Sequence, residues 1–200
     1  MTKENTPKQR ISQRQQRQEQ VQRQKKNRLL RVWLPVGLLA IALTAFAIYQ
    51  FTRPDFEGVI DLGTQQRGHD VDVSYVGEPL PPAGGVHHPT WQNCGIYDQP
   101  VNTSNAIHAL EHGAVWLAYH PDLPAAQVTA LQDLVAGKGY VLMSPYPGLN
   151  GQVVMTAWGK RLVLDTVAED RIDDFINRYR GGGPEPGASC SGGVGTPIRS

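Results

Sequence analysis

The chain has 200 residues and a formal net charge of +1. This small value conceals two oppositely charged parts, because residues 1–31 carry ten Lys and Arg against two Glu, a net +8, whereas the other 169 residues carry −7. Between them, Val32–Phe51 has no charged residue and 16 apolar positions out of 20. A helix of that length spans about 30 Å, the thickness of a bilayer's hydrocarbon core. We therefore do not expect a purely cytosolic globular protein.

Residues 32–51 predict an uncleaved transmembrane helix. A cleaved signal peptide has a shorter apolar region followed by small residues, whereas this segment ends in Ile48-Tyr49-Gln50-Phe51. The positive-inside rule then predicts that residues 1–31 lie in the cytoplasm and that the chain after Thr52 lies outside the cell membrane. A buried core helix is the alternative, but it leaves the charge asymmetry unexplained.

The N-terminal tail, residues 1–31, is basic and rich in Gln, with few apolar residues. Such a composition predicts a disordered or transiently helical segment. Its cations are expected to contact anionic lipid of the inner leaflet. We predict no nucleic-acid binding, because membrane insertion already requires cations on this side.

Residues 58–180, after a linker at 52–57, are long enough for one extracytoplasmic domain. Apolar runs predict strands, and amphipathic stretches with caps predict helices. The expected strands are 59–62, 71–76, 114–119, 140–143, 153–158 and 162–164, and the expected helices are 104–112, 124–136 and 168–180. This interspersed order predicts an α+β fold with a mixed sheet and about three helices. It does not predict the strand order.

The C-terminal segment, residues 181–200, contains seven Gly and three Pro and would be a loose tail by composition. It holds Cys190, and the only other cysteine is Cys94. In an oxidising compartment two cysteines most simply pair, so we predict a disulfide that ties this tail to the domain. Two free thiols or an intermolecular bridge are the alternatives.

The residues that point to chemistry are His108, Glu111 and His112, on the predicted helix 104–112. Histidines at i and i+4 project from one helix face and can bind one ion together. His87 or His88, on the Gly-rich loop before Trp91, can supply a third imidazole. Three histidines with an open position suit zinc or copper, so we predict a metal site at His87, His108 and His112, with Glu111 and His88 as additional candidates.

Two other interpretations stay open. His108-x-x-Glu111-His112 matches the H-x-x-E-H pattern of inverzincin metallopeptidases, although five positions with two wildcards are weakly specific. The histidines can also be buried structural residues that hydrogen-bond to backbone carbonyls. His69 and His120 are isolated in the sequence and are expected at the surface or in turns.

Four separated blocks resemble the DUF3105 family of bacterial membrane-anchored proteins of unknown function. They are Pro81-Pro-x-x-Gly-x-His87 with Trp91, Gly95-x-Tyr97-Asp98, His108-x-Leu-Glu-His-Gly-Ala-Val115 and Thr156-Ala-Trp-Gly159. By this resemblance, the loop histidine of the family matches His87 and its helical Glu-His pair matches Glu111 and His112. The family often has Thr-Ser-Gly where this chain has Ala83-Gly84-Gly85, which argues against serine chemistry. The resemblance implies no activity or cofactor.

We therefore expect a single-pass membrane protein whose extracytoplasmic domain binds copper or zinc. The alternative is an interaction or scaffold domain of the cell envelope without a metal, and a metal-dependent hydrolase ranks third. The sequence identifies no protein partner, substrate or oligomeric state.

Overall fold

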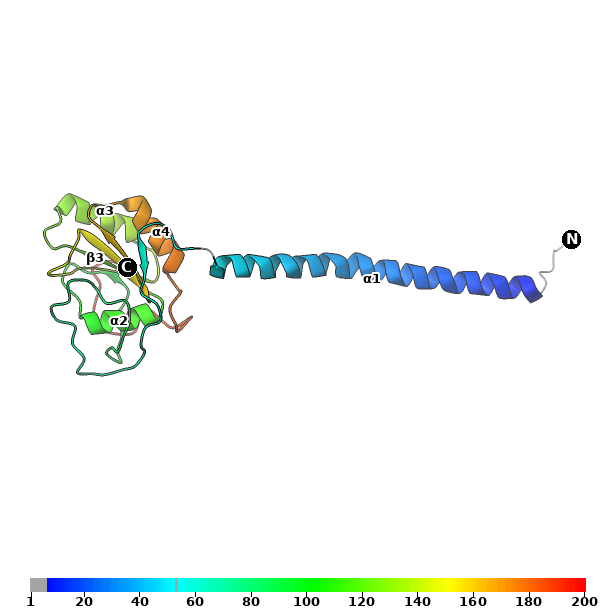
Figure 1. Cartoon of the computed structure of the whole chain (residues 1–200), viewed down its shortest axis with the longest axis horizontal. Helices are drawn as coiled ribbons and strands as arrows, with labels where there is room; N and C mark the ends of the chain where they lie inside the picture. The colour runs from blue at the N-terminus through cyan, green and yellow to red at the C-terminus, as the bar shows by residue number, and fades with distance from the viewer. Residues whose placement is uncertain (1–6, 53) are drawn as a thin grey trace. The chain divides into compact units, whose positions relative to one another are not determined.

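The computed structural model describes residues 7–52 and 54–200. The chain divides into two units, Met1–Asp55 and Phe56–Ser200, and each is described by itself. Helix α1 (Pro7–Thr52) makes up the first unit (Figure 1). Residues 7–31, for which we expect a disordered or transiently helical tail, are helical in the structure. Gln, Arg and Lys, which dominate this stretch, are good helix formers; residues 1–6 of the tail lie outside the described residues.

Among the described residues, one helical segment, Gln20–Tyr49, is long and apolar enough to cross a membrane, as judged by length and composition. It includes most of the predicted span 32–51. None of its most apolar window is buried against the rest of the protein. An apolar helix near the N-terminus is compatible with a membrane anchor or a signal sequence.

A mixed six-stranded sheet forms the centre of the second unit. Its spatial order is β1-β6-β5-β3-β4-β2. The strands are β1 (Val59–Asp61), β2 (Gly95–Ile96), β3 (Val115–Tyr119), β4 (Val141–Pro145), β5 (Val153–Ala157) and β6 (Lys160–Leu164). β4 pairs in parallel with β2 and β3, and the other pairs are antiparallel. The predicted α+β class is therefore confirmed.

Helices cover both faces of the sheet (Figure 1). α3 (Ala125–Val135) and α4 (Glu169–Tyr179) pack on one face, and α2 (Thr103–Glu111) packs on the other. Along β3, Val115 and Leu117 join the core beneath α3 and α4, whereas Trp116 joins the core beneath α2. Because successive side chains of a strand point to opposite faces, one apolar strand supplies both cores.

One predicted strand is wrong. Residues 71–76 form loop and turns, and the structure leaves Val71 and Val76 exposed. The alternation of apolar and polar residues in this run resembles a half-buried strand, but no strand among the described residues pairs with it. The short strand β2 was not predicted, because two residues carry no periodic signal. The other predicted strands and helices are present with boundaries shifted by up to two residues.

The disulfide between Cys94 and Cys190 is present, as predicted, with the two Cα atoms 5.4 Å apart. A backbone hydrogen bond from Cys94 N to the Cys190 carbonyl oxygen, 2.8 Å long, lies beside it. Earlier in the tail, Gly181 N donates to the Gly113 carbonyl and Glu185 N donates to the Glu111 carbonyl. The Gly/Pro-rich tail is therefore fixed against the end of α2.

Candidate metal centre

Helix α2 presents different side chains to its two sides. Ala106 and Leu110 are buried in the core between α2 and the sheet. Asn102 caps the N-terminus of α2, because its side chain accepts a hydrogen bond from Asn105 N at 3.2 Å. His108 and Glu111, on the other side of the helix, are also buried. Buried polar groups require partners, and loop segments supply them here.

Two of these loop segments pair with each other through backbone hydrogen bonds. His87 N donates to the Gly68 carbonyl at 2.9 Å, and Asp70 N donates to the His87 carbonyl at 2.8 Å. This isolated parallel bridge aligns His69 with His87. Their imidazole rings consequently lie edge to face, with centroids 4.9 Å apart.

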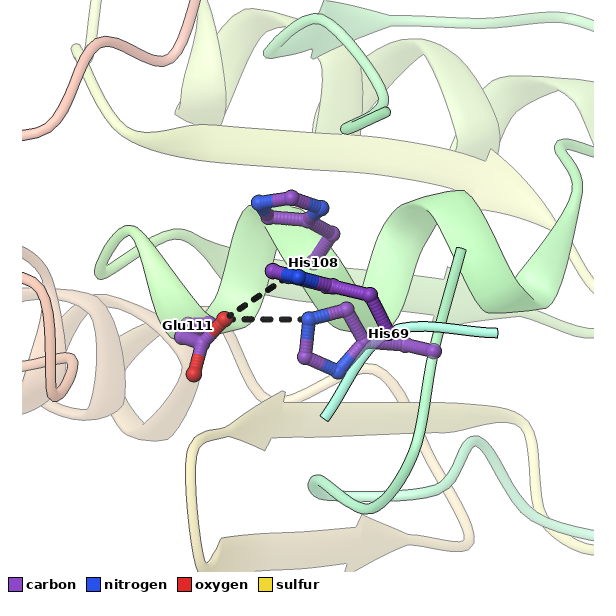
Figure 2. A group of neighbouring side chains, drawn as sticks. His69, His108 and Glu111 are labelled. Carbon is purple, nitrogen blue, oxygen red and sulfur yellow. Dashed lines mark hydrogen bonds and ion pairs between the residues drawn. The ribbon is translucent and has the colours of Figure 1, made fainter. Parts of the chain in front are cut away.

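Four side chains form what we name the inner group: His69, His87, His108 and Glu111. Each offers one ligand atom, and these atoms all lie within 4.8 Å of one another. Glu111 Oε2 lies 3.0 Å from His87 Nε2 and 3.7 Å from His69 Nε2. Figure 2 shows His69 meeting Glu111 beside α2, close to His108. The inner group thus joins one helix to two loops.

The rings of His87, His108 and His112 are oriented by the same kind of hydrogen bond. In each, Nδ1 contacts a backbone carbonyl oxygen, that of Gly85 at 2.7 Å, His88 at 2.8 Å and Ser189 at 2.7 Å, respectively. A carbonyl only accepts hydrogen bonds, so Nδ1 must carry the proton. Each neutral ring therefore has its lone pair on Nε2. Hydrogen bonds of this kind fix the tautomer and the ring of metal-binding histidines.

The contact between His87 and Glu111 requires a proton or a metal ion between the two groups. Both ring nitrogens of His87 face acceptors, the Gly85 carbonyl and the Glu111 carboxylate. A proton must then lie on His87 Nε2 or on Glu111 for the 3.0 Å contact to be favourable. A metal ion can take the place of this proton, as happens when histidines bind metals.

Charge neighbours keep Glu111 ionised although its residue is only 2% exposed. Burial alone would raise the pKa of Glu111, but the hydrogen bond from Arg67 and the charges of His87 and Arg67 outweigh it and lower the pKa. Arg67 Nε lies 2.6 Å from Glu111 Oε1. Oε2 is therefore the oxygen left for the histidines or an ion.

His108 is held in its neutral form. Burial lowers its pKa, and the nearby His112, His87 and His69 lower it further, while the hydrogen bond to the His88 carbonyl acts in the opposite direction. A neutral imidazole is the form that binds metal ions. Among the described residues, no hydrogen-bond donor faces its Nε2.

A second set of ligand atoms, which we name the outer group, consists of His108, His112 and Glu185. Its atoms also lie within 4.8 Å of one another, and His112 Nε2 is 3.5 Å from Glu185 Oε2. The other oxygen of Glu185, Oε1, pairs with Arg67 Nη2 at 3.1 Å. His108 belongs to both groups.

Two tryptophans border these groups. Trp91 packs on His112 and His108, with ring centroids 4.8 Å and 5.8 Å away, and Trp158 packs edge-on against His87 at 5.9 Å. Aromatic walls of this kind limit water access and strengthen electrostatic interactions inside.

The candidate residues from the sequence are distributed over the two groups. His87, His108 and Glu111 lie in the inner group, whereas His112 joins His108 in the outer group. His88 lies outside both, and its Nδ1 accepts from Thr90 N at 3.0 Å and from the Asn105 amide at 3.1 Å. His120 also lies outside both, where it accepts a hydrogen bond from Asp122 N.

His69 is exposed, as expected, but it is not isolated in space, because the bridge between loops brings it against His87 and His108. Sequence reasoning also missed Arg67 and Glu185. Both come from segments without regular structure, so no periodicity marked them. The predicted disulfide was the one available signal for Glu185, since it places the C-terminal tail near the histidine loop.

The donor set limits the chemistry. Three imidazoles and one carboxylate are ligands that zinc and copper(II) accept. Two ligand atoms on one tetrahedral zinc ion are about 3.3–3.4 Å apart, given bonds of about 2.0–2.1 Å. The separations of 3.0 Å and 3.7 Å around Glu111 Oε2 bracket that value. The other ligand-atom separations of the inner group are at most 4.8 Å.

A family model described as a protein of unknown function (DUF3105) matches residues 68–192, more than half of the chain. The match includes every residue of the inner and outer groups. Searches of curated proteins and of solved structures gave no match.

Proposed function

The chain belongs to the DUF3105 family, and we propose that it binds one transition-metal ion, zinc or copper, through the inner group of His69, His87, His108 and Glu111. The observation that carries this proposal is the shared ring orientation at His87 and His108. Backbone carbonyls occupy Nδ1 of both rings, so both Nε2 atoms are left for one ion.

The charges of the site support the proposal. Glu111 is ionised and His108 is neutral at neutral pH, as the directions of their pKa shifts require. A divalent cation would then replace only the proton between His87 and Glu111, because neither His108 Nε2 nor the Glu111 carboxylate has another proton to lose. Burying the Glu111 carboxylate without a cation nearby would cost free energy, so the surroundings of Glu111 stabilise positive charge.

The test is metal binding by the full chain, purified in detergent micelles. We expect one zinc or copper ion per chain by elemental analysis after dialysis. His87→Ala should weaken binding by at least about tenfold, since ligand loss costs more than the loss of an orienting hydrogen bond. Glu111→Gln should weaken it similarly, because the amide keeps the size but loses the charge.

His120→Ala is the matched control, because His120 is a histidine outside both groups and should bind like the wild type. Spectra of the copper(II)-loaded chain would also count the imidazoles that bind the ion, through their nitrogen couplings. The proposal fails if the wild type takes up neither metal in titration, or if His87→Ala and His120→Ala bind alike.

We also propose that residues 32–51 anchor the chain in the cell membrane, with the metal-binding unit outside and the basic tail at the anionic inner leaflet. The length and composition of the apolar helix support the anchor, and the Cys94–Cys190 disulfide supports an oxidising compartment for the domain. An alkaline phosphatase fused after Ser200 should be active, and the chain should resist extraction by alkaline carbonate. An inactive fusion would overturn the orientation, and release by carbonate would overturn the anchor.

A further inference from the structure

We propose that the outer group of His108, His112 and Glu185 is a second position for the same ion, and that His108 passes the ion between the inner and outer groups. This inference rests on the proposed function of the inner group. It deepens that function, because two overlapping positions suit a protein that transfers a metal ion rather than one that keeps it permanently.

The ligand atoms of the outer group are spaced nearly as they would be around one metal ion. His112 Nδ1 donates to the Ser189 carbonyl, so its Nε2 carries the lone pair. Glu185 Oε2 lies 3.5 Å from that Nε2, which is longer than an ordinary hydrogen bond. It is, however, close to the separation of about 3.3–3.4 Å expected for two ligands of one tetrahedral ion.

His108 can serve only one position at a time. Its Nδ1 is committed to the His88 carbonyl, so the neutral ring has a single lone pair, on Nε2. Its ring centroid is 4.8 Å from that of His87 on the inner side and 4.6 Å from that of His112 on the outer side. An ion that keeps its bond to His108 can therefore exchange inner ligands for outer ligands one by one.

Arg67 balances the charge of this exchange. Its guanidinium contacts Glu111 through Nε and Glu185 through Nη2, so it bridges the carboxylates of the two groups. An ion at the inner position repels Arg67 towards Glu185, and an ion at the outer position repels it towards Glu111. Whichever carboxylate lacks the ion keeps a cationic partner, which reduces the cost of moving the ion.

The two carboxylates differ in access to solvent. The side chain of Glu185 is 40% exposed, whereas that of Glu111 is 2% exposed. Glu185 can therefore leave the ion and return to water, while Glu111 cannot. This difference makes the outer position the weaker and more labile one, where an acceptor ligand can replace Glu185.

The experiment uses the full chain in detergent micelles, loaded with zinc. Binding affinity is measured by titration, and the transfer rate is measured by adding a chromophoric chelator. We expect one ion per wild-type chain. His112→Ala and Glu185→Gln should change the affinity by less than about threefold but slow transfer to the chelator several-fold, because the intermediate position is lost.

The inner ligand variant tests the outer position directly. His87→Ala should still bind one ion, at least about tenfold more weakly, and adding Glu185→Gln to it should abolish this residual binding. His87→Asn, whose amide nitrogen lies where Nδ1 does and can still donate to the Gly85 carbonyl, serves if His87→Ala does not fold. His120→Ala should match the wild type in affinity and in transfer rate.

The outcomes separate this inference from the proposed function. If the wild type binds no ion, the proposed function fails and the inference fails with it. If the wild type binds an ion but His112→Ala and Glu185→Gln transfer it at the wild-type rate, only the outer position is overturned. The same holds if Glu185→Gln does not weaken the residual binding of the inner ligand variant.

Discussion

Arg67 and Glu111 form an ion pair across 44 sequence positions, with Arg67 Nε 2.6 Å from Glu111 Oε1. The Arg67 side chain is half exposed, whereas the Glu111 side chain is buried. The pair also raises the pKa of Arg67, chiefly through the hydrogen bond to Glu111. Arg67 therefore supplies from the surface a positive charge that the buried carboxylate requires, and a metal ion can supply the same charge from the histidine side.

The first prediction concerns Arg67→Ala. We expect it to lower the free energy of unfolding of the metal-free protein by more than the loss of a surface arginine does, because Glu111 loses a buried charged partner. Zinc should raise the melting temperature of this variant by more than it raises that of the wild type, since the ion compensates the carboxylate. Calorimetry with and without zinc measures both effects.

Arg199→Ala is the matched control for this experiment. The side chains of Arg199 and Arg67 are equally exposed, but Arg199 pairs with the exposed Asp133. Surface pairs of this kind contribute at most about 1 kcal/mol. Equal destabilisation of the two arginine variants, or an equal response to zinc, would show that Arg67 has no special relation to the metal centre.

The second prediction concerns the disulfide, which joins residues 96 positions apart. The double substitution Cys94→Ser and Cys190→Ser should reduce the free energy of unfolding by about 4–5 kcal/mol in the chain-entropy model. Urea denaturation in the presence and absence of a reductant measures this effect. The reductant should destabilise the wild type and leave the double variant unchanged, whereas a wild type that is equally stable with and without the reductant would contradict the assignment.

Much of the fold could be predicted because it depends on local signals. The strand Val115–Tyr119 is a run of apolar residues, and α4 places Ile172, Phe175 and Ile176 on one buried face. The cysteines could be paired because the chain has only two. The strand order depends on which edges meet in three dimensions, and no single segment encodes that.

The site was predictable only where its residues share a helix. His108, Glu111 and His112 follow from helical spacing, and His87 was a candidate because it lies on the Gly-rich loop before Trp91. His69 could not be predicted, since a two-residue backbone bridge positions it. The separation of the histidines into two groups also depends on how the loops fold over α2, which spacing does not reveal.

The third prediction concerns pH and the pair Lys138–Asp173, which joins the end of α3 to α4. The hydrogen bond from Lys138 holds the pKa of Asp173 below its ordinary value of 3.8. A carboxyl with a lowered pKa stabilises the fold above its unfolded-state pKa and loses this contribution as the pH falls through the folded-state pKa. Asp173→Asn should therefore lower stability at neutral pH and have little effect in strong acid.

The expected size is at most about 1 kcal/mol at neutral pH, because the pair is partly exposed and screened by solvent. Urea midpoints of the metal-free protein between neutral pH and about pH 3 measure it. Asp165→Asn is the control, since Asp165 is exposed and forms no ion pair within the described part of the chain. A difference between wild type and Asp173→Asn that grows towards acid would contradict the sign of the effect.

The fourth prediction concerns Gly183, where the C-terminal tail crosses the end of α2. A Cβ atom on Gly183 would collide with the Glu111 carbonyl oxygen and with the backbone of Gly113. These are backbone atoms and cannot rotate away, so Gly183→Ala should destabilise the domain by about 1–3 kcal/mol. It should also move Glu185 away from His112, because Glu185 N is bonded to the same Glu111 carbonyl.

Gly139→Ala provides the comparison, because a Cβ atom there meets nothing within 4 Å. Its melting temperature should stay unchanged or rise slightly, since alanine reduces the entropy of the unfolded chain. Melting temperatures report the packing effect, and zinc transfer to a chelator reports the position of Glu185. If Gly183→Ala melts below the wild type yet transfers zinc at an unchanged rate, the tail stabilises the fold without positioning Glu185, because a displaced Glu185 must slow the exchange at the outer group.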